Sequence, residues 1–244
     1  MSFIVSLYES LFRPRAALHE LSGQELVELL TTPQRVFNIT DKRTLPMWSP
    51  VRLSPSYRRK DNVVCASCLV LDYDDGTTID VAMATWSRWY RILHTSWSHR
   101  PDKHRFRLVL PLQRDVTPEE YPALWRWAEV FADRQVDKAC KDISRAWALP
   151  ATDQSNKQHV GQFEWKVGTG DLLAPDEVIP LAPPPPIKVN YKRVMPSAVW
   201  SAHPASSWSS VPAAVVKRHG GGSTPTFKSW RTATTAHLVV GKDH

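Results

Sequence analysis

The sequence predicts an α+β fold in which helices pack on a mixed sheet, followed by a disordered C-terminal tail. Apolar or alternating runs typical of strands span residues 62–74, 92–97, 105–112 and 162–167. Apolar residues at helical spacing span residues 82–93 and 118–134. Prolines, serines, glycines and basic residues dominate the C-terminal part, which can bury too little apolar surface to offset the entropy cost of ordering it. We therefore expect an N-terminal helical and extended segment packed on the core (1–60), a core domain (61–180), and a basic linker and tail (181–244).

Composition restricts the class of protein. The 244 residues carry a formal net charge of +7, which indicates an anionic partner, nucleic acid first, although part of the excess can lie in a solvated tail. The eleven tryptophans serve as core residues or as stacking platforms for bases. Three cysteines, an odd number, with no secretion signal or membrane span, predict a cytoplasmic protein without disulfides. Cys65 and Cys68 have zinc-site spacing, but strand alternation favours opposite faces for them, so we expect no zinc site.

The N-terminal segment contains one clear helix signal. Ser22 followed by Glu25 is a capping-box pattern ahead of an apolar run. The following residues are rich in proline, as in an extended segment that lies on other structure. Basic residues occur at 42–43 and 58–60, where they either reach phosphates or form a solvated surface.

The core begins with a strand, a helix and a second strand within about 35 residues, for which a parallel unit is the default connection. Thr77, Thr78 or Asp80 can cap this helix. In the next strand, alternation places Phe106, Leu108 and Leu110 on the core face, and Arg105 and Arg107 together on the opposite face. These two arginines are either an anion clamp or part of an ordinary half-solvated strand.

The helix expected at 118–134 has complete start signals. Thr117 is the expected N-cap, Pro118 occupies the first helical position, and Glu120 closes a capping box. The apolar stripe of this helix should be core. Its members are Tyr121, Leu124, Trp125, Ala128 and Phe131.

Carboxylates gather at the end of the first core strand, LVLDYDD (69–75). Asp72 and Asp74 point the same way in a strand, and such like charges are stabilised by a divalent cation between them. The alternative is an acidic turn at Asp75 and Gly76. Further along, VDKACKDISRAWALPA (136–151) adds two acids and an arginine, namely Asp137, Asp142 and Arg145.

Four motifs in this order resemble the archaeo-eukaryotic primase superfamily, and more narrowly the primase or primase-polymerase domains of phage and plasmid replication proteins. They cover about two-fifths of the chain. The matching stretches are LVLDYDD (69–75), HTSWSHRPDKHRFRLVLPL (94–112), VTPEEY (116–121) and VDKACKDISRAWALPA (136–151).

The resemblance implies an RRM-like palm. Asp72 and Asp74 would supply the first metal motif, with Asp137 as the third acid and Asp142 as its fallback. Ser98 and His99 match the nucleotide-contacting Ser-x-His element, although the strand that often carries that histidine has arginines here. His99 would thus join the acids as a catalytic residue. The expected phosphate-binding residues are Ser98, His99, Arg105, Arg107 and Arg145.

The implied reaction is template-dependent nucleotidyl transfer by a DNA primase or primase-polymerase. Two Mg²⁺ or Mn²⁺ ions held by carboxylates would stabilise the attacking and leaving oxygens, and hard cations of this kind prefer oxygen ligands. The implied partners are a single-stranded DNA template, nucleoside triphosphates and, because no nucleotide-hydrolysing motif is present, a separate replicative helicase or initiator. The setting would be the cytoplasm of a bacterial host cell.

Two other classes stay open at this stage. A metal-dependent nuclease or rolling-circle initiator would require a His-x-His metal motif and a helical nucleophilic tyrosine, and neither arrangement is found in the sequence. A non-catalytic single-strand binder of the same fold requires only the tryptophans and the basic tail.

Overall fold

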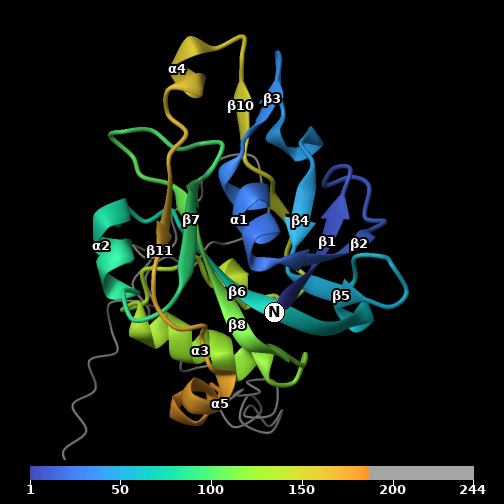
Figure 1. Ribbon diagram of the computed structural model, residues 1–244, viewed down its shortest axis with the longest axis vertical. Helices are drawn as coiled ribbons and strands as arrows, with labels where there is room; N and C mark the ends of the chain where they lie inside the picture. The colour runs from blue at the N-terminus through green and yellow to red at the C-terminus, as the bar shows by residue number, and fades with distance from the viewer. Residues whose placement is uncertain (187–244) are drawn as a thin grey trace, which may run out of the picture. The chain divides into compact units, whose positions relative to one another are not determined.

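The computed structural model describes residues 1–186, and the predicted linker and tail lie outside the described residues from position 187 onward. The expected α+β class is confirmed, because helices pack around a five-stranded sheet (Figure 1). The strands of this sheet follow the order β11-β7-β8-β6-β5. Their bounds are β5 (Val51–Leu53), β6 (Val63–Tyr73), β7 (Arg91–Thr95), β8 (Phe106–Val116) and β11 (Trp165–Gly168).

Every neighbouring pair in this sheet is antiparallel. β6 and β7 therefore run in the same direction, as expected, but β8 lies between them. The expectation of a mixed sheet with an adjacent parallel pair is wrong for this sheet, because β8 forms a ladder with both strands. A parallel pair occurs instead between two short strands elsewhere, β3 (Gln34–Val36) and β10 (Ala151–Asp153).

The N-terminal region forms a second sheet, which the sequence did not predict. Its order is β2-β1-β4-β9. The bounds are β1 (Ser2–Tyr8), β2 (Ala17–Ser22), β4 (Met47–Ser49) and β9 (Trp147–Ala148). The predicted short helix follows β2 as α1 (Gly23–Thr31), and both hydrogen bonds of the Ser22–Glu25 capping box form. Because β9 comes from late in the chain, this sheet joins the N-terminal region to the residues just after Arg145.

Two helices pack near the five-stranded sheet, α2 (Ile79–Thr85) and α3 (Tyr121–Phe131). Thr78 is the N-cap of α2. The Thr117–Glu120 capping-box hydrogen bonds also form, at 2.9 and 3.3 Å, but residues 118–120 make a turn and the helix proper begins later than expected. Tryptophans after α2 and in α3 form one aromatic cluster, which makes them core residues. Its members are Trp86, Trp89, Trp127 and the partly exposed Phe131.

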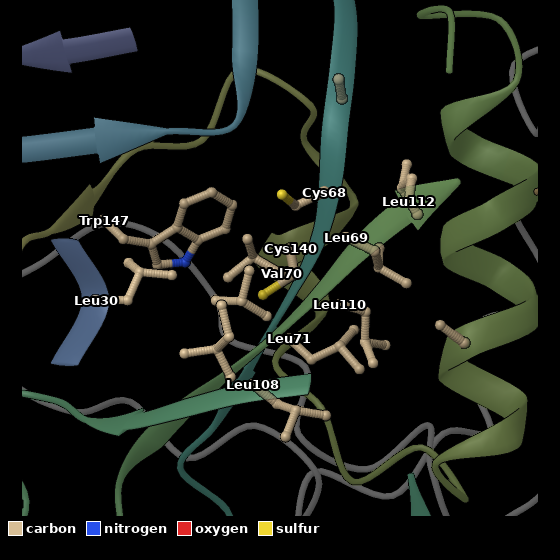
Figure 2. Close-up of a cluster of buried hydrophobic side chains, with 14 of the residues drawn as sticks. Leu30, Cys68, Leu69, Val70, Leu71, Leu108, Leu110, Leu112, Cys140 and Trp147 are labelled. Atoms are coloured by element: carbon tan, nitrogen blue, oxygen red, sulfur yellow. The ribbon is translucent and has the colours of Figure 1, made fainter. Parts of the chain in front are cut away.

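Strand β6 is covered on both faces, which explains its nearly continuous apolar sequence. Figure 2 shows Leu30 of α1 and Trp147 on one side of β6 and β8, and a helix beside Leu112 on the other. Alternation along β6 places Cys68, Val70 and Asp72 on one face. Asp72 thus continues an apolar row and lies at the point where that row reaches solvent.

The remaining elements are short. Within residues 1–186, no helix has the length and apolar character needed to cross a membrane. The short helices are η1 (Lys42–Thr44), η2 (Lys60–Asn62), η3 (Lys138–Lys141), α4 (Lys157–Val160), α5 (Pro175–Val178) and η4 (Ile179–Leu181).

Candidate nucleotide site

Two carboxylates at the end of β6 share one arginine. The Arg145 Nη2 atom lies 3.0 Å from Asp137 Oδ2 and 3.5 Å from Asp72 Oδ2. On the other side of Asp72, its Oδ1 lies 3.8 Å from Arg107 Nε, because Arg107 is the cross-strand partner of Asp72 on β8. All of these side chains are at least two-thirds buried, so solvent screens their charges only partly.

The backbone explains why Asp137 reaches this place. The Asp137 N–H donates to the Asp72 carbonyl oxygen at 2.9 Å, which fixes the start of η3 against the end of β6. Asp137 also caps η3, since its carboxylate accepts from the Ala139 N–H. Asp142, the fallback third acid, accepts instead from the backbone N–H and hydroxyl of Ser144. The geometry therefore brings Asp137, and not Asp142, into the ion-pair group around Asp72.

Asp74 is not part of this group. It follows the last residue of β6 and is exposed, and its side chain makes no hydrogen bond or ion pair with the described residues. Asp75 accepts from the Thr77 N–H at 3.1 Å, next to Gly76 with φ of 109°, which is the local contact of a turn residue. In the part of the chain that the structure describes, no set of three acidic, histidine or cysteine side chains is arranged to hold a metal ion.

A cavity of about 380 Å³ lies over Asp72. Its walls come from both sheets and from the loops between them, and its acidic members are Asp72 and Asp142. Five basic residues also line it, so the cavity has an excess of positive charge that suits a polyanion. They are Lys42, Arg43, Arg58, Arg107 and Arg145.

Arg107 is the most buried cation of this cavity. Its side chain is 12% exposed, and its Nη1 donates to the Ala148 carbonyl oxygen at 2.8 Å. Its Nε makes no hydrogen bond within residues 1–186. Burial lowers the pKa of the guanidinium, and the neighbouring Asp72 opposes that shift. A cation in a poorly solvated place attracts anions strongly.

The predicted Ser-x-His element lies beside this cavity. Ser98 lines it, together with Ser96 and Trp97. His99 lies instead in a second cavity of about 510 Å³, which shares Trp97 and Ser98 with the first. Burial lowers the pKa of His99.

Arg105 does not accompany Arg107 into either cavity. It precedes the first residue of β8, and its backbone N–H donates to His99 Nδ1 at 3.2 Å while its carbonyl oxygen accepts from Ser96. The contact of Arg105 with the histidine loop is thus made by its backbone.

Sequence reasoning missed His94. Cross-strand pairing places it beside Arg107, so that Asp72, Arg107 and His94 form one row across β6, β8 and β7. The ring is fully buried, and its pKa falls to about 3 through desolvation first and the nearby Arg107 second. Alternation along residues 91–97 could have indicated its face, but not its burial.

Sequence reasoning also left the N-terminal basic residues without a definite role. Lys42 and Arg43 belong to η1, whose loop is held by a hydrogen bond from the Leu11 N–H to the Arg43 carbonyl oxygen. Arg58 is held by its own N–H, which donates to the Pro14 carbonyl oxygen at 2.8 Å. These backbone contacts place the basic side chains along one wall of the first cavity.

Comparison with known proteins identifies the family. The model of the VapE N-terminal domain matches residues 51–182, more than half of the chain, and the protein therefore belongs to this family. Family membership supports the relation to phage and plasmid replication proteins that the motifs indicated. Nothing matches among curated proteins.

One solved structure is similar in fold. It is the AEP domain of the primase-polymerase of cyanophage S-2L, with 12% sequence identity and a TM-score of 0.43, over 75% of this chain and 89% of that domain.

Proposed function

We propose that this protein is a DNA primase or primase-polymerase of phage or plasmid replication, which joins nucleotides on a template. The observations that carry the proposal are the basic cavity lined by Asp72 and Arg145, and the ion pairs that Arg145 makes with both Asp72 and Asp137. In this proposal, the five-stranded sheet with α2 and α3 is an RRM-like palm, and the cavity receives the triphosphate of a nucleotide.

The carboxylates fit a divalent cation. Two of their oxygens already converge on one positively charged atom, Arg145 Nη2. Oxygen donors of this kind suit Mg²⁺ or Mn²⁺, and Asp72 and Asp137 would hold such an ion, with Asp74 as the further expected ligand. When bound, these ions supply charge stabilisation to the attacking and leaving oxygens.

The basic residues would bind and orient the triphosphate. Arg107 provides a fixed, poorly solvated cation at the base of the cavity, and Lys42, Arg43 and Arg58 provide more exposed charges along its wall. Arg145 would leave the two acids and contact a phosphate as the cation and the nucleotide enter. Its guanidinium thus stabilises the acids before substrate binds.

The template would be single-stranded DNA, and the proposed setting is the bacterial cytoplasm. Because a primase needs unwound template, we infer that a separate helicase or initiator supplies it.

The test is template-directed incorporation of labelled nucleotides with Mg²⁺ or Mn²⁺ by the wild-type protein and by Asp72→Asn. We expect a loss of at least about 100-fold, since several kcal/mol of charge stabilisation is removed. Asp115→Asn is the matched control, because Asp115 lies on the same sheet, contacts Cys65 and lines neither cavity. Equal activity of wild type and Asp72→Asn would exclude the proposed role of Asp72.

A second candidate is a non-catalytic single-strand binder of the same fold. It is favoured by the ion pairs that Asp72 and Asp137 already make with arginines, and by the lack of any ion pair of Asp74 within residues 1–186. Absence of synthesis with either metal ion, together with tight binding of single-stranded DNA measured by fluorescence anisotropy, would support this candidate over the first.

A further inference from the structure

The second cavity differs from the first in its chemistry. Its lining includes Arg100 as the one permanently charged residue, and it contains no carboxylate. Three amide side chains line it, from Asn156, Gln158 and Gln162. Amides offer both hydrogen-bond donors and acceptors, as the edges of nucleobases do. A triphosphate would be drawn to the more basic first cavity, so the second suits an uncharged polar group.

His99 forms part of the wall of this cavity, and its tautomer is fixed by a backbone contact. Its residue is 3% exposed, and its Nε2 atom has no hydrogen-bond partner within the described part of the chain. The Arg105 backbone N–H can only donate, so His99 Nδ1 must accept from it, and a neutral ring then carries its proton on Nε2. This Nε2 atom has almost no accessible surface, so His99 shapes the cavity wall with a fixed tautomer and does not offer this N–H to a ligand.

Trp97 provides an aromatic wall that is shared by both cavities. Its position is held by His159, whose ring centroid lies 4.0 Å from the Trp97 ring at an interplanar angle of 46°. His159 Nδ1 accepts from the Asp153 N–H, so its Nε2 donates to the Trp97 carbonyl oxygen at 3.0 Å. The tryptophan is therefore held in place before any ligand arrives, as a stacking platform requires.

We propose that the second cavity binds the base of a nucleotide whose phosphates occupy the first cavity, with Trp97 and Ser98 at the junction. This inference rests on the proposed phosphate site, and it adds a base-recognition part built from the His99 loop and the residues around α4. Gln158 is exposed and Gln162 is half-buried, and both line this cavity, so a bound ligand can reach their amides.

The test compares two probes, a nucleoside triphosphate and inorganic tripolyphosphate, by isothermal titration of the full chain with Ca²⁺ present, so that no reaction is needed. Wild type should bind the nucleoside triphosphate at least about 10-fold more tightly than tripolyphosphate, because stacking of one base is worth that much. Trp97→Leu and Gln162→Ala should each weaken nucleoside triphosphate binding and leave tripolyphosphate binding unchanged.

Gln162→Ala keeps the test valid if Trp97→Leu does not fold, because Gln162 is half-buried and does not belong to the core, so truncating it should cost little stability. Equal affinity of wild type for the two probes, equal weakening of both by the variants, or no binding of the nucleoside triphosphate would each overturn the base site. If nucleotide incorporation fails while base-dependent binding is found, the proposed primase activity is wrong and the base site stands.

Discussion

Arg107 allows a quantitative prediction about the first cavity. Its guanidinium lies between Asp72 and the Ala148 carbonyl oxygen, and 12% of the side chain is exposed. Arg107→Met keeps most of the aliphatic volume and removes the charge and all N–H donors. Asp72 retains Arg145 as a partner at 3.5 Å, so the change does not leave it as an unpaired buried charge.

The expected loss differs between folding and binding. Folding loses the donor to the Ala148 carbonyl and one partner of Asp72, at a cost of about 1–2 kcal/mol in the free energy of unfolding. Binding of a triphosphate loses a charge-assisted hydrogen bond in a place that solvent screens weakly, about 2–3 kcal/mol. That is a rise of about 30- to 150-fold in the Kd of a nucleoside triphosphate.

The assay is isothermal titration of wild type and variant with a nucleoside triphosphate and Ca²⁺, beside urea unfolding to establish that the variant is folded. The matched control is Arg114→Met, on the same strand, because Arg114 pairs with Glu120 and Asp176 and lines neither cavity. We expect a Kd near the wild-type value for the control. A folded Arg107→Met protein that binds as tightly as wild type would refute the assignment of the phosphate site.

Two further predictions concern stability. In Gly168→Ala, an added Cβ would lie 2.3 Å from Arg91 Cζ and displace a buried guanidinium. We therefore expect the free energy of unfolding, measured in urea, to fall by about 2–3 kcal/mol. The control Gly161→Ala, whose added Cβ has its nearest neighbours at 3.9 Å, should be nearly as stable as wild type. His94 has a folded-state pKa of about 3, below its unfolded value, so the stability it contributes is present above about pH 6.5 and is lost as the pH falls toward 3. Between pH 7.5 and pH 5, this residue should account for a loss of about 2 kcal/mol in the free energy of unfolding. Over the same pH range, the free energy of unfolding of His94→Leu should therefore fall by about 2 kcal/mol less than that of wild type. An equal fall in both proteins would contradict the lowered pKa of His94.

Local signals in the sequence predicted local structure well. The capping boxes at Ser22 and Thr117 form because each needs only residues three positions apart. The apolar run that ends at Asp72 predicted a strand covered on both faces, and β6 is such a strand. Phe106, Leu108 and Leu110 are all buried as expected, because alternation is a property of a single strand.

Contacts between distant residues could not be predicted in the same way. The insertion of β8 between β6 and β7 depends on pairing energies that no single segment reveals. In the N-terminal sheet, β4 and β9 have only three and two residues, so pairing with distant segments decides their structure. For the same reason Lys42 could not be assigned to the cavity wall from its own neighbours in sequence.

For the candidate site, too, the sequence indicated individual residues but not the contacts between separate elements. The motif order indicated Asp72 and Asp137 together, but the hydrogen bond that joins their backbones spans two separate elements. Arg105 and Arg107 were predicted on one face, and the structure places only Arg107 in the cavity lining, since Arg105 lies before the start of β8. Alternation applies only within a strand, and the sequence does not define where the strand begins.

The central claim is that Asp72 and Asp137 receive a divalent cation while Arg145 moves to the phosphates. Its most direct test is a crystal structure with Mn²⁺ and a non-hydrolysable nucleoside triphosphate, in which the anomalous signal locates the metal. The proposal predicts a Mn²⁺ peak between the two carboxylates, with the Arg145 guanidinium on a phosphate oxygen. A bound nucleotide with Arg145 still between Asp72 and Asp137, and with no Mn²⁺ at either carboxylate, would contradict it.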